Sequence, residues 1–366
     1  MKSLVLIDGN AIIHRAYHSI PKNFTSQKGE LTNAVYGFAL TLIRVLEDLH
    51  PEYIICSFDL PGPTFRHEKF KAYKATRVKA DQELYDQIPR IKELVMALGI
   101  TIIEEPGFEA DDIIGTTVKK IRDHELQNGN EISTYIITGD KDTYQLVNGN
   151  VFIYDLKKGS GQPRIIDRKR IKEEYDLEPE DFIDLKALSG DASDNIPGIP
   201  GIGDKTATML LKKFKTLDGI YKVIEESQLQ NQESFIVSSS GGQRHDPGIQ
   251  VDKKPLDSRL RGNDKVKPED DSIRDIKPRI LELLIKYKDQ AFLSRELATI
   301  HCDVPLKFKL SDVNWGEYDK EVLRKLFEEL GFRSLINRFG NNADQNKSKT
   351  KAAEEIKKKD QQLKLL

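Results

Sequence analysis

Short apolar runs that end in aspartate recur in the first half of the chain. Runs of this kind are typical of buried parallel strands. They cover residues 3–7, followed by Asp8; residues 53–58, followed by Asp59; and residues 134–138, followed by Asp140 and Asp142. Helical patterns lie between them, at residues 33–49 and 88–98, so the alternation predicts a parallel α/β sheet. Because ligands bind beyond the carboxyl ends of such strands, we expect these aspartates on one rim.

A further acidic group stands at the head of a predicted helix. Glu109, Asp111 and Asp112 follow a strand-like run at residues 101–104 and open the helix expected at residues 113–121. Acidic residues in a first helical turn are common, because the helix dipole favours negative charge there. That explanation suffices for any one carboxylate. It does not suffice for the whole acidic set, whose members would repel one another strongly on a single rim.

The whole acidic set contains nine carboxylates. They are Asp8, Asp59, Glu109, Asp111, Asp112, Asp140, Asp142, Asp191 and Asp194. Oxygen ligands without histidine or cysteine select a hard cation, so the sequence predicts Mg²⁺, with Mn²⁺ as a substitute. Two such ions about 3.5–4 Å apart form a clamp for phosphodiester hydrolysis. The set therefore indicates a two-metal centre.

Residues 189–207 combine two kinds of chemistry. Asp191 and Asp194 stand three residues apart, so both carboxylates can face one side of a turn and share a cation. A glycine-rich hairpin at residues 198–203 follows and leads into a helix expected from Asp204. Its glycines let a ligand approach closely, and the N–H groups of the helix start favour a phosphate. The alternative is an N-cap with two tight turns.

The charge balance inverts in a basic stretch at residues 65–79. Six basic residues stand there against one acidic residue, and three aromatic residues are interleaved. The basic and aromatic residues are Arg66, Lys69, Lys71, Lys74, Arg77 and Lys79, with Phe65, Phe70 and Tyr73. Basic groups neutralise phosphates and aromatic rings stack on bases, so the basic stretch suits a single strand. A solvated charged helix is the alternative, but the position directly after Asp59 favours substrate contact.

Composition sets wider limits. A length of 366 residues allows about two domains, and 38% hydrophobic residues suffice for a buried core. The chain has no run of about eighteen apolar residues and no signal-peptide pattern, so we expect a cytoplasmic protein without membrane contact. Cys56 is expected in a strand core, and neither Cys56 nor Cys302 has metal-ligand spacing. Among the seven histidines only His14 and His18 have an H-x₃-H spacing, and no cysteine pair accompanies them, so no zinc site is expected. The formal net charge of −2 does not by itself indicate DNA binding.

Several motifs together resemble the flap endonuclease family, in particular the 5′ nuclease domain of bacterial DNA polymerase I. They occur in the family's order as VLIDGN, SFD with FRHEKFKAYKATR, GFEADDIIG, ITGDKDTYQL and LSGDASDNIPGIPGIGDKTA. With ATIHCDVPL and ELGFRSLINRFG, the resemblance extends over residues 2–340. It implies a PIN-like, resolvase-like α/β core. An α-helical DNA-binding region with a helix-hairpin-helix (H2TH) motif, which often binds K⁺, would follow.

The resemblance also implies an activity: divalent-metal-dependent 5′-3′ exonuclease and 5′ flap endonuclease on DNA, including removal of RNA primers. It places all nine carboxylates at metal positions, and it places Lys74 and Arg77 beneath a helical arch, where they steer the scissile phosphate. The residues expected to contact DNA are Arg66, Tyr73, Gly198, Gly201, Ile202, Gly203, Lys205 and Thr206. The expected partners of a monomeric protein are DNA 5′ ends and flaps, RNA–DNA primer junctions, and a polymerase domain in the same chain or in another.

The expected boundaries give a catalytic core at residues 1–175, with the arch at about residues 65–90, and a helical half at residues 176–340. Residues 227–272 have no counterpart in the family. They are polar and lack helical or strand periodicity, so we expect a helix to end near Glu226 and disorder to follow. A charged tail at residues 341–366 completes the chain.

Three other functions deserve comparison. A DNA-binding module without catalysis would gain nothing from nine carboxylates that face a polyanion. An RNA-cutting PIN-type nuclease is disfavoured by the long helix-hairpin-helix half. A phosphoacceptor receiver domain also gathers aspartates at strand ends, but it needs fewer of them and no hairpin.

Overall fold

The structure, a computed structural model, describes residues 2–129, 131–156, 163–240, 276–316, 318–336 and 338. These residues form two compact units. The first comprises the chain up to Phe182 and resumes at Thr299, and the second comprises Ile183–Ala298. The predicted boundary at residues 175/176 lies within the first unit. The segment from Thr299 onward was expected in the helical half, but it packs with the first unit.

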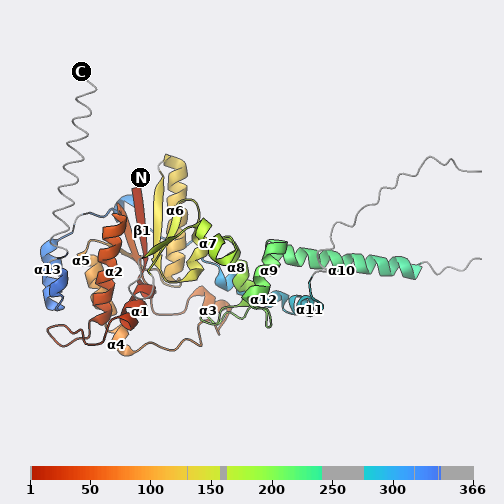
Figure 1. The fold of residues 1–366 in the computed structure, drawn as a ribbon, viewed down its shortest axis with the longest axis horizontal. Helices are drawn as coiled ribbons and strands as arrows, with labels where there is room; N and C mark the ends of the chain where they lie inside the picture. Colours follow the sequence, from red (N-terminus) through yellow and green to blue (C-terminus); the bar gives the residue numbers. More distant parts are fainter. Residues whose placement is uncertain are drawn as a thin grey trace, which may run out of the picture. The chain divides into compact units, whose positions relative to one another are not determined.

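A six-stranded sheet organises the first unit (Figure 1). Its order is β3-β2-β1-β4-β5-β6, and all neighbouring strands are parallel except β5 and β6. The strands are β1 (Lys2–Asp8), β2 (Tyr53–Ser57), β3 (Thr101–Ile103), β4 (Ile132–Thr138), β5 (Val151–Asp155) and β6 (Arg164–Ile166). The prediction of a mainly parallel α/β sheet is confirmed, and the antiparallel edge strand β6 departs from it.

Helices cover both faces of this sheet. Those of the first unit are α1 (Gly9–Ser19), α2 (Asn33–Leu49), α3 (Phe65–Lys69), α4 (Gln82–Tyr85), α5 (Ile88–Ala97), α6 (Ala110–Asn128), η1 (Lys141–Leu146), α7 (Arg168–Tyr175), η3 (Leu310–Val313) and α13 (Lys320–Glu329). Helices α1, α2, α5 and α13 pack on one face, and α6 lies on the other (Figure 1). Burial on two faces explains why β1 is apolar without alternation. Cys56 lies in the β2 core, as predicted.

The region predicted as a helical arch, about residues 65–90, is not one continuous helix. It contains the short helices α3 and α4 and the start of α5. Residues 71–76 form turns, and residues 77–81 have no regular structure.

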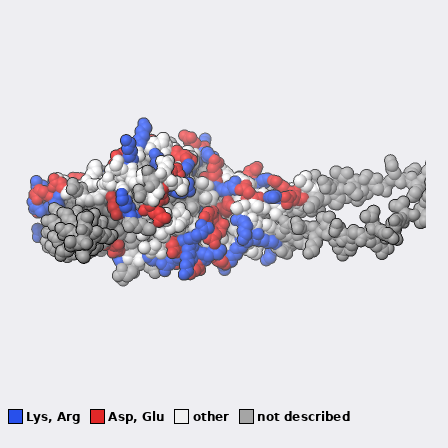
Figure 2. All heavy atoms as spheres, turned by 90° about the horizontal axis from the view of Figure 1, so that it is seen from above, with Lys and Arg blue, Asp and Glu red and all other residues white. Residues whose placement is uncertain are grey.

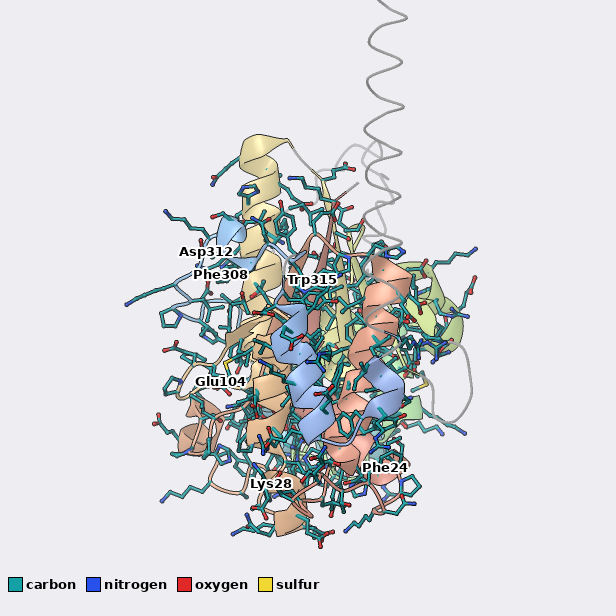
Figure 3. All side chains as sticks on the ribbon, turned by 90° about the vertical axis from the view of Figure 1, so that its left-hand side faces the viewer. Phe24, Lys28, Glu104, Phe308, Asp312 and Trp315 are labelled. Carbon is teal, nitrogen blue, oxygen red and sulfur yellow. The ribbon has the colours of Figure 1, made fainter. Side chains whose placement is uncertain are left out.

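A return segment, residues 299–336, completes the first unit at the β3 edge of the sheet. Trp315 donates from Nε1 to the carbonyl oxygen of Leu98 at 2.9 Å, and Thr101 donates from its hydroxyl to the carbonyl oxygen of Asp312 at 3.3 Å. Figure 3 shows Phe308, Asp312 and Trp315 on this side of the unit. The chain thus returns to the sheet after it leaves the second unit.

The second unit is α-helical. Helix α8 (Asp181–Ser189) leads into it, and α9 (Asp204–Phe214), α10 (Leu217–Ser240), α11 (Pro278–Lys286) and α12 (Lys288–Ala298) follow. The helix expected to end near Glu226 continues to Ser240, because residues 227–240 contain neither proline nor glycine. The rest of the predicted insertion and the tail at residues 341–366 lie outside the described residues. No helix in the described part of the chain is long and apolar enough to cross a membrane.

Candidate functional site

Three adjacent parallel strands end in aspartate at one edge of the sheet. In the β1–β2 register, Asp8 is level with Ser57, two residues before Asp59. On the other side of β1, β4 ends at Thr138, two residues before Asp140. The structure therefore brings these three predicted site residues to one rim, and the parallel topology is the reason.

Hydrogen bonds fix the orientation of two of these carboxylates. Asp8 caps α1, because its Oδ1 accepts the N–H of Ala11 at 3.0 Å, while its Oδ2 accepts the hydroxyl of Thr138 at 2.8 Å. Asp59 accepts the N–H of Ala110, the first residue of α6, at 2.7 Å. The ends of β1 and β2 are thus tied to the starts of α1 and α6.

Asp111 adds a further carboxylate beside these aspartates, and one of its oxygens lacks a hydrogen-bond partner. The residue is partly exposed, but its Oδ1 is buried and has no hydrogen-bond partner. Burial raises the pKa of Asp111 well above its usual value, and the charges of Asp8, Asp140, Asp142 and Asp59 raise it further. Burial, with the charges of Asp59 and Asp140, also raises the pKa of Asp8 to about 6, against the effect of its hydrogen bonds. These five carboxylates, which we call the strand-end rim, repel one another.

The strand-end rim has the donor set of a site for a hard divalent cation, because it offers only carboxylate oxygens. The buried Oδ1 of Asp111 and the mutual repulsion support that fit. Among the residues that the structure describes, no three acidic, histidine or cysteine side chains are arranged to hold an ion as they stand. The carboxylates accept hydrogen bonds instead; Asp140, for example, accepts the N–H of Asp142 at 2.9 Å.

Glu109 and Asp112 bind the basic stretch. Oε2 of Glu109 accepts the hydroxyl of Tyr73 at 3.0 Å and lies 2.9 Å from Nζ of Lys74. Asp112 is 0% exposed and accepts two hydrogen bonds from Arg66, at 2.8 and 2.7 Å. Both carboxylates were predicted as metal ligands. In this structure Glu109 has cationic partners and Asp112 lies in a buried ion pair, and the assignment of both as metal ligands stays a prediction.

Arg66 and Tyr73 were predicted to contact DNA, yet each is only 3% exposed. Burial would lower the pKa of Arg66, but the hydrogen bonds and charge of Asp112, with the charge of Glu109, raise it overall. The Tyr73 ring packs edge-on against His67, with ring centroids 5.3 Å apart. In this structure both side chains are part of the packed interior rather than of a surface for bases.

The two predicted catalytic cations lie close enough to the strand-end rim to affect it. Lys74 has a φ of 55°, and Arg77 is exposed. Burial raises the pKa of Asp59 overall, whereas the charges of Lys74 and Arg77 act to lower it. Cationic charge therefore already acts on the carboxylate at the end of β2.

Asp191 and Asp194, the remaining predicted ligands, belong to the second unit. Asp191 accepts hydrogen bonds from Nζ of Lys186 and from the N–H and hydroxyl of Ser193, the latter two at 2.7 Å. Burial opposes its ionisation, but Lys186 and Ser193 lower its pKa to about 2. Asp194 is 7% exposed. The assignment of this second-unit pair as metal ligands stays a prediction.

The glycine hairpin is a tight turn that requires glycine. Gly198 has a φ of 57°, and a Cβ at this position would lie 2.2 Å from the backbone nitrogen of Gly190. The N–H of Gly198 donates to the hydroxyl of Ser294 at 3.0 Å, and its carbonyl oxygen accepts the side-chain amide of Gln290 at 2.6 Å. Helix α12 therefore holds the hairpin in place.

The predicted DNA contacts of the hairpin differ in exposure. Ile202 is 3% exposed, so it supports the turn from inside. Gly201, Gly203 and Lys205 are exposed, and Thr206 is half-buried. A Cβ at Gly203 would meet no atom within 4 Å, so packing within the protein does not explain this glycine. It caps α9, where a small residue leaves the N–H groups open to an anion.

Sequence reasoning missed three contributors to the site. Asn10 and Thr138 each donate to a strand-end aspartate at 2.8 Å. Both stand within two residues of such an aspartate, so adjacency could have indicated them. The return segment reaches the basic stretch through the carbonyl oxygen of Thr299, which accepts Arg66 at 2.8 Å. No local signal could have shown that contact.

The surface mixes both signs of charge. Figure 2 shows Lys and Arg side chains gathered along the lower border of the face in view, with Asp and Glu beside them. The formal net charge of −2 therefore coexists with local basic areas. Charge distribution rather than net charge decides whether a polyanion is attracted.

Two family descriptions match the chain over consecutive ranges. Residues 3–176 match the N-terminal resolvase-like domain of 5′-3′ exonucleases, and residues 177–240 match their C-terminal SAM fold. Together these ranges cover more than half of the chain. The chain therefore belongs to the 5′-3′ exonuclease family, whose members are nucleases.

Relatives named DNA polymerase I are longer than this chain. The chain is 36% identical over 339 residues to DNA polymerase I of Bacillus subtilis (strain 168). The aligned residues make up 93% of this chain and 32% of the relative. It is 33% identical over 337 residues to the thermostable DNA polymerase I of Thermus thermophilus, and these residues make up 92% of this chain and 33% of the relative. The chain spans about a third of the length of these relatives.

Solved structures confirm the fold. The zinc-bound T5 5′-exonuclease matches with a TM-score of 0.56 at 18% identity, over 90% of this chain and 98% of that chain. The catalytic core of Rad2 with DNA substrate matches with a TM-score of 0.52 at 15% identity, over 90% and 88% of the two chains. The predicted order, a resolvase-like α/β core and then a helical region, is therefore confirmed.

Proposed function

We propose that this chain is a divalent-metal-dependent 5′ nuclease that removes nucleotides from DNA 5′ ends and cuts 5′ flaps, including those that begin with RNA primers. The observation that carries the proposal is the strand-end rim, where carboxylates from three adjacent strands and the start of α6 repel one another. Membership in the 5′-3′ exonuclease family supports the reaction class.

The strand-end rim would hold Mg²⁺, with Mn²⁺ as a substitute. A divalent ion bound there would lower the pKa of water and neutralise charge on a phosphate. Zinc bound to the T5 5′-exonuclease supports the use of a divalent cation. Glu109 and the second-unit pair, Asp191 and Asp194, remain further candidate ligands within this proposal.

The chain's own cations would orient the scissile phosphate. Lys74 lies 2.9 Å from Glu109, and its charge acts on Asp59 together with that of Arg77. A phosphate placed near Asp59 would therefore meet both cations, which stabilise the negative charge that builds during phosphoryl transfer. Because Glu109 already binds Lys74, substrate would have to share or displace that contact.

The hairpin would bind the backbone of the duplex. Exposed Gly203 and Lys205 at the start of α9 offer N–H groups and a positive charge, and a K⁺ ion at the hairpin belongs to the same proposal. The DNA complex of the Rad2 catalytic core supports a nucleic-acid substrate. The relatives named DNA polymerase I support a polymerase domain as partner, in this chain or in another. Action as a monomer, on DNA in the cytoplasm, completes the proposal.

The test is cleavage of a 5′-end-labelled flap duplex in Mg²⁺, with blunt duplex and single-stranded RNA as matched substrates. We expect cleavage near the flap junction that stops with EDTA and returns with Mn²⁺. Tight flap binding without cleavage in either metal would instead favour a DNA-binding module. Preference for the single-stranded RNA would favour the RNA-cutting class.

A further inference from the structure

Two adjacent aspartates at the start of α6 have opposite surroundings. Asp111 has a buried oxygen without a hydrogen-bond partner, whereas both oxygens of Asp112 have two donors each. Oδ2 of Asp112 accepts from Arg66 at 2.8 Å and from the N–H of Glu109 at 3.0 Å. Its Oδ1 accepts from Arg66 at 2.7 Å and from the N–H of His301 at 2.8 Å. Asp112 thus has no oxygen position left for a cation.

Arg66 joins three parts of the first unit through this carboxylate. Its guanidinium also donates to the carbonyl oxygen of Thr299 at 2.8 Å and lies 3.4 Å from Oε2 of Glu109. Helix α3, the first turn of α6 and the return segment therefore meet at one buried cation. The Arg66 side chain is 3% exposed and that of Asp112 is 0% exposed, so water does not compete for the contact.

Close packing holds the return segment against α6. A Cβ at Gly115 would lie 2.5 Å from Cγ2 of Ile300. The ring of His301 packs 5.6 Å from Phe65 and 5.8 Å from Phe108, measured between centroids. Cζ of Arg66 also lies 4.5 Å from the centroid of the Phe65 ring, so the buried ion pair is in an environment where an unpaired charge is strongly unfavourable.

We propose that Asp112 is a positioning residue, not a metal ligand. It is the counter-ion of Arg66, and the pair fixes the first turn of α6. Glu109 then faces the basic stretch, while Asp111 faces the other four carboxylates of the strand-end rim. This inference rests on the proposed function, because it concerns how the candidate metal centre is built. It assigns different roles to Asp111 and Asp112, which the sequence motif alone would treat as two metal ligands.

The first test compares Asp111→Asn with Asp112→Asn by calorimetric titration of the DNA-free protein with Mn²⁺, at a temperature where both are folded. The substitutions are chemically identical and one residue apart, so each is the control for the other. We expect the loss of Mn²⁺ affinity in Asp111→Asn to exceed that in Asp112→Asn by about 10-fold or more. Equal losses, or a larger loss in Asp112→Asn, would overturn the proposal.

The second test is thermal unfolding without metal or DNA. Asparagine at position 112 turns a donor toward Arg66, so Asp112→Asn should lower the melting temperature by about 10 °C, whereas Asp111→Asn should leave it unchanged or raise it. If Asp112→Asn does not fold, the double variant Arg66→Met/Asp112→Leu replaces it. We expect the double variant to melt above Arg66→Met alone and to retain Mn²⁺ binding. A double variant that folds but binds no Mn²⁺ would overturn the proposal.

The two tests separate this inference from the proposed function. If the wild-type protein neither binds Mn²⁺ nor cuts flap DNA, the proposed function fails, and the unfolding comparison still decides whether Asp112 pairs with Arg66. If the wild type cuts flap DNA and Asp112→Asn melts like Asp111→Asn, the positioning role fails while the nuclease remains.

Discussion

The strand-end rim of the first unit and the second-unit pair present the same residue type in opposite electrostatic settings. Burial and neighbouring carboxylates raise the pKa of Asp8 to about 6 and that of Asp111 well above its usual value. In the second unit, Lys186 and Ser193 lower the pKa of Asp191 to about 2 despite burial. Repulsion among carboxylates therefore dominates at Asp8 and Asp111 in the rim, whereas Asp191 is paired with a cation.

This difference indicates where a bound metal ion would relieve the most repulsion between carboxylates. An ion at the strand-end rim would relieve repulsion among several ligands at once. An ion at Asp191 would have to compete with the ammonium group of Lys186, which is bound to its Oδ2. If both groups bind metal, the rim should bind more tightly and matter more for cleavage.

The largest expected effect is on cleavage. Asp140→Asn removes a rim charge next to Asp142 and should slow flap cleavage at least about 10³-fold, the equivalent of about 4 kcal/mol of lost stabilisation. Asp191→Asn should slow it far less, because Lys186 already neutralises that carboxylate. Single-turnover rates on one flap substrate, with flap binding measured alongside, provide the comparison. Equal losses in the two variants contradict the ranking.

The next effect concerns the cations beside the rim. Lys74→Ala should slow single-turnover cleavage by about 10²-fold while duplex affinity changes little, because its charge acts near Asp59. The matched control is Lys205→Ala, which removes an exposed lysine from the second unit. It should weaken DNA binding and reduce by about 1 the slope of log affinity against log salt concentration, with the cleavage step unchanged. If both variants alter only affinity, Lys74 has no role in the reaction.

Much of the rim was predictable because topology leaves few choices. Apolar runs that end in aspartate become adjacent parallel strands, and their ends must then meet at one edge. The different roles of Asp111 and Asp112 were not predictable. Arg66 lies 46 residues from Asp112, and His301 lies 189 residues away, so the partners that satisfy one aspartate are set by tertiary contacts.

Two local features were missed. Strands β5 and β6 were not predicted, although they have five and three residues, the same lengths as the predicted strands β2 and β3. The extension of α10 to Ser240 was missed because polar composition was taken as a sign of disorder, although the run lacks helix breakers. Absence of proline and glycine was the better indicator at that point.

A smaller effect concerns stability in the absence of metal. Asp8→Asn removes a repelled charge and can keep the cap of α1, so it should stabilise the protein by up to about 1 kcal/mol. Asp191→Asn leaves Lys186 without its carboxylate and should destabilise the protein by about 1 kcal/mol. Urea unfolding in EDTA measures both changes. If the free energy of unfolding changes in the same direction in both variants, the proposed electrostatic difference between the two regions is wrong.

The smallest expected effect comes from residues 241–272, which lie outside the described residues. Replacing them by a short Gly/Ser linker should leave flap cleavage and folding essentially unchanged. The segment contains few large apolar residues, and loop-closure cost changes by only about 0.6 kcal/mol per doubling of length. The linker keeps all of α10 and the buried Ile276 before α11. Cleavage rate and the salt dependence of flap affinity are the measurements.

A length-matched variant separates chain length from charge in this last prediction. It replaces by serine the basic residues Arg244, Lys253, Lys254, Arg259 and Arg261. If these residues add phosphate contacts, both the linker variant and the serine variant will show a shallower salt slope than the wild type, because fewer counterions are released. Unchanged slopes in both mean that the segment makes no contribution to DNA binding.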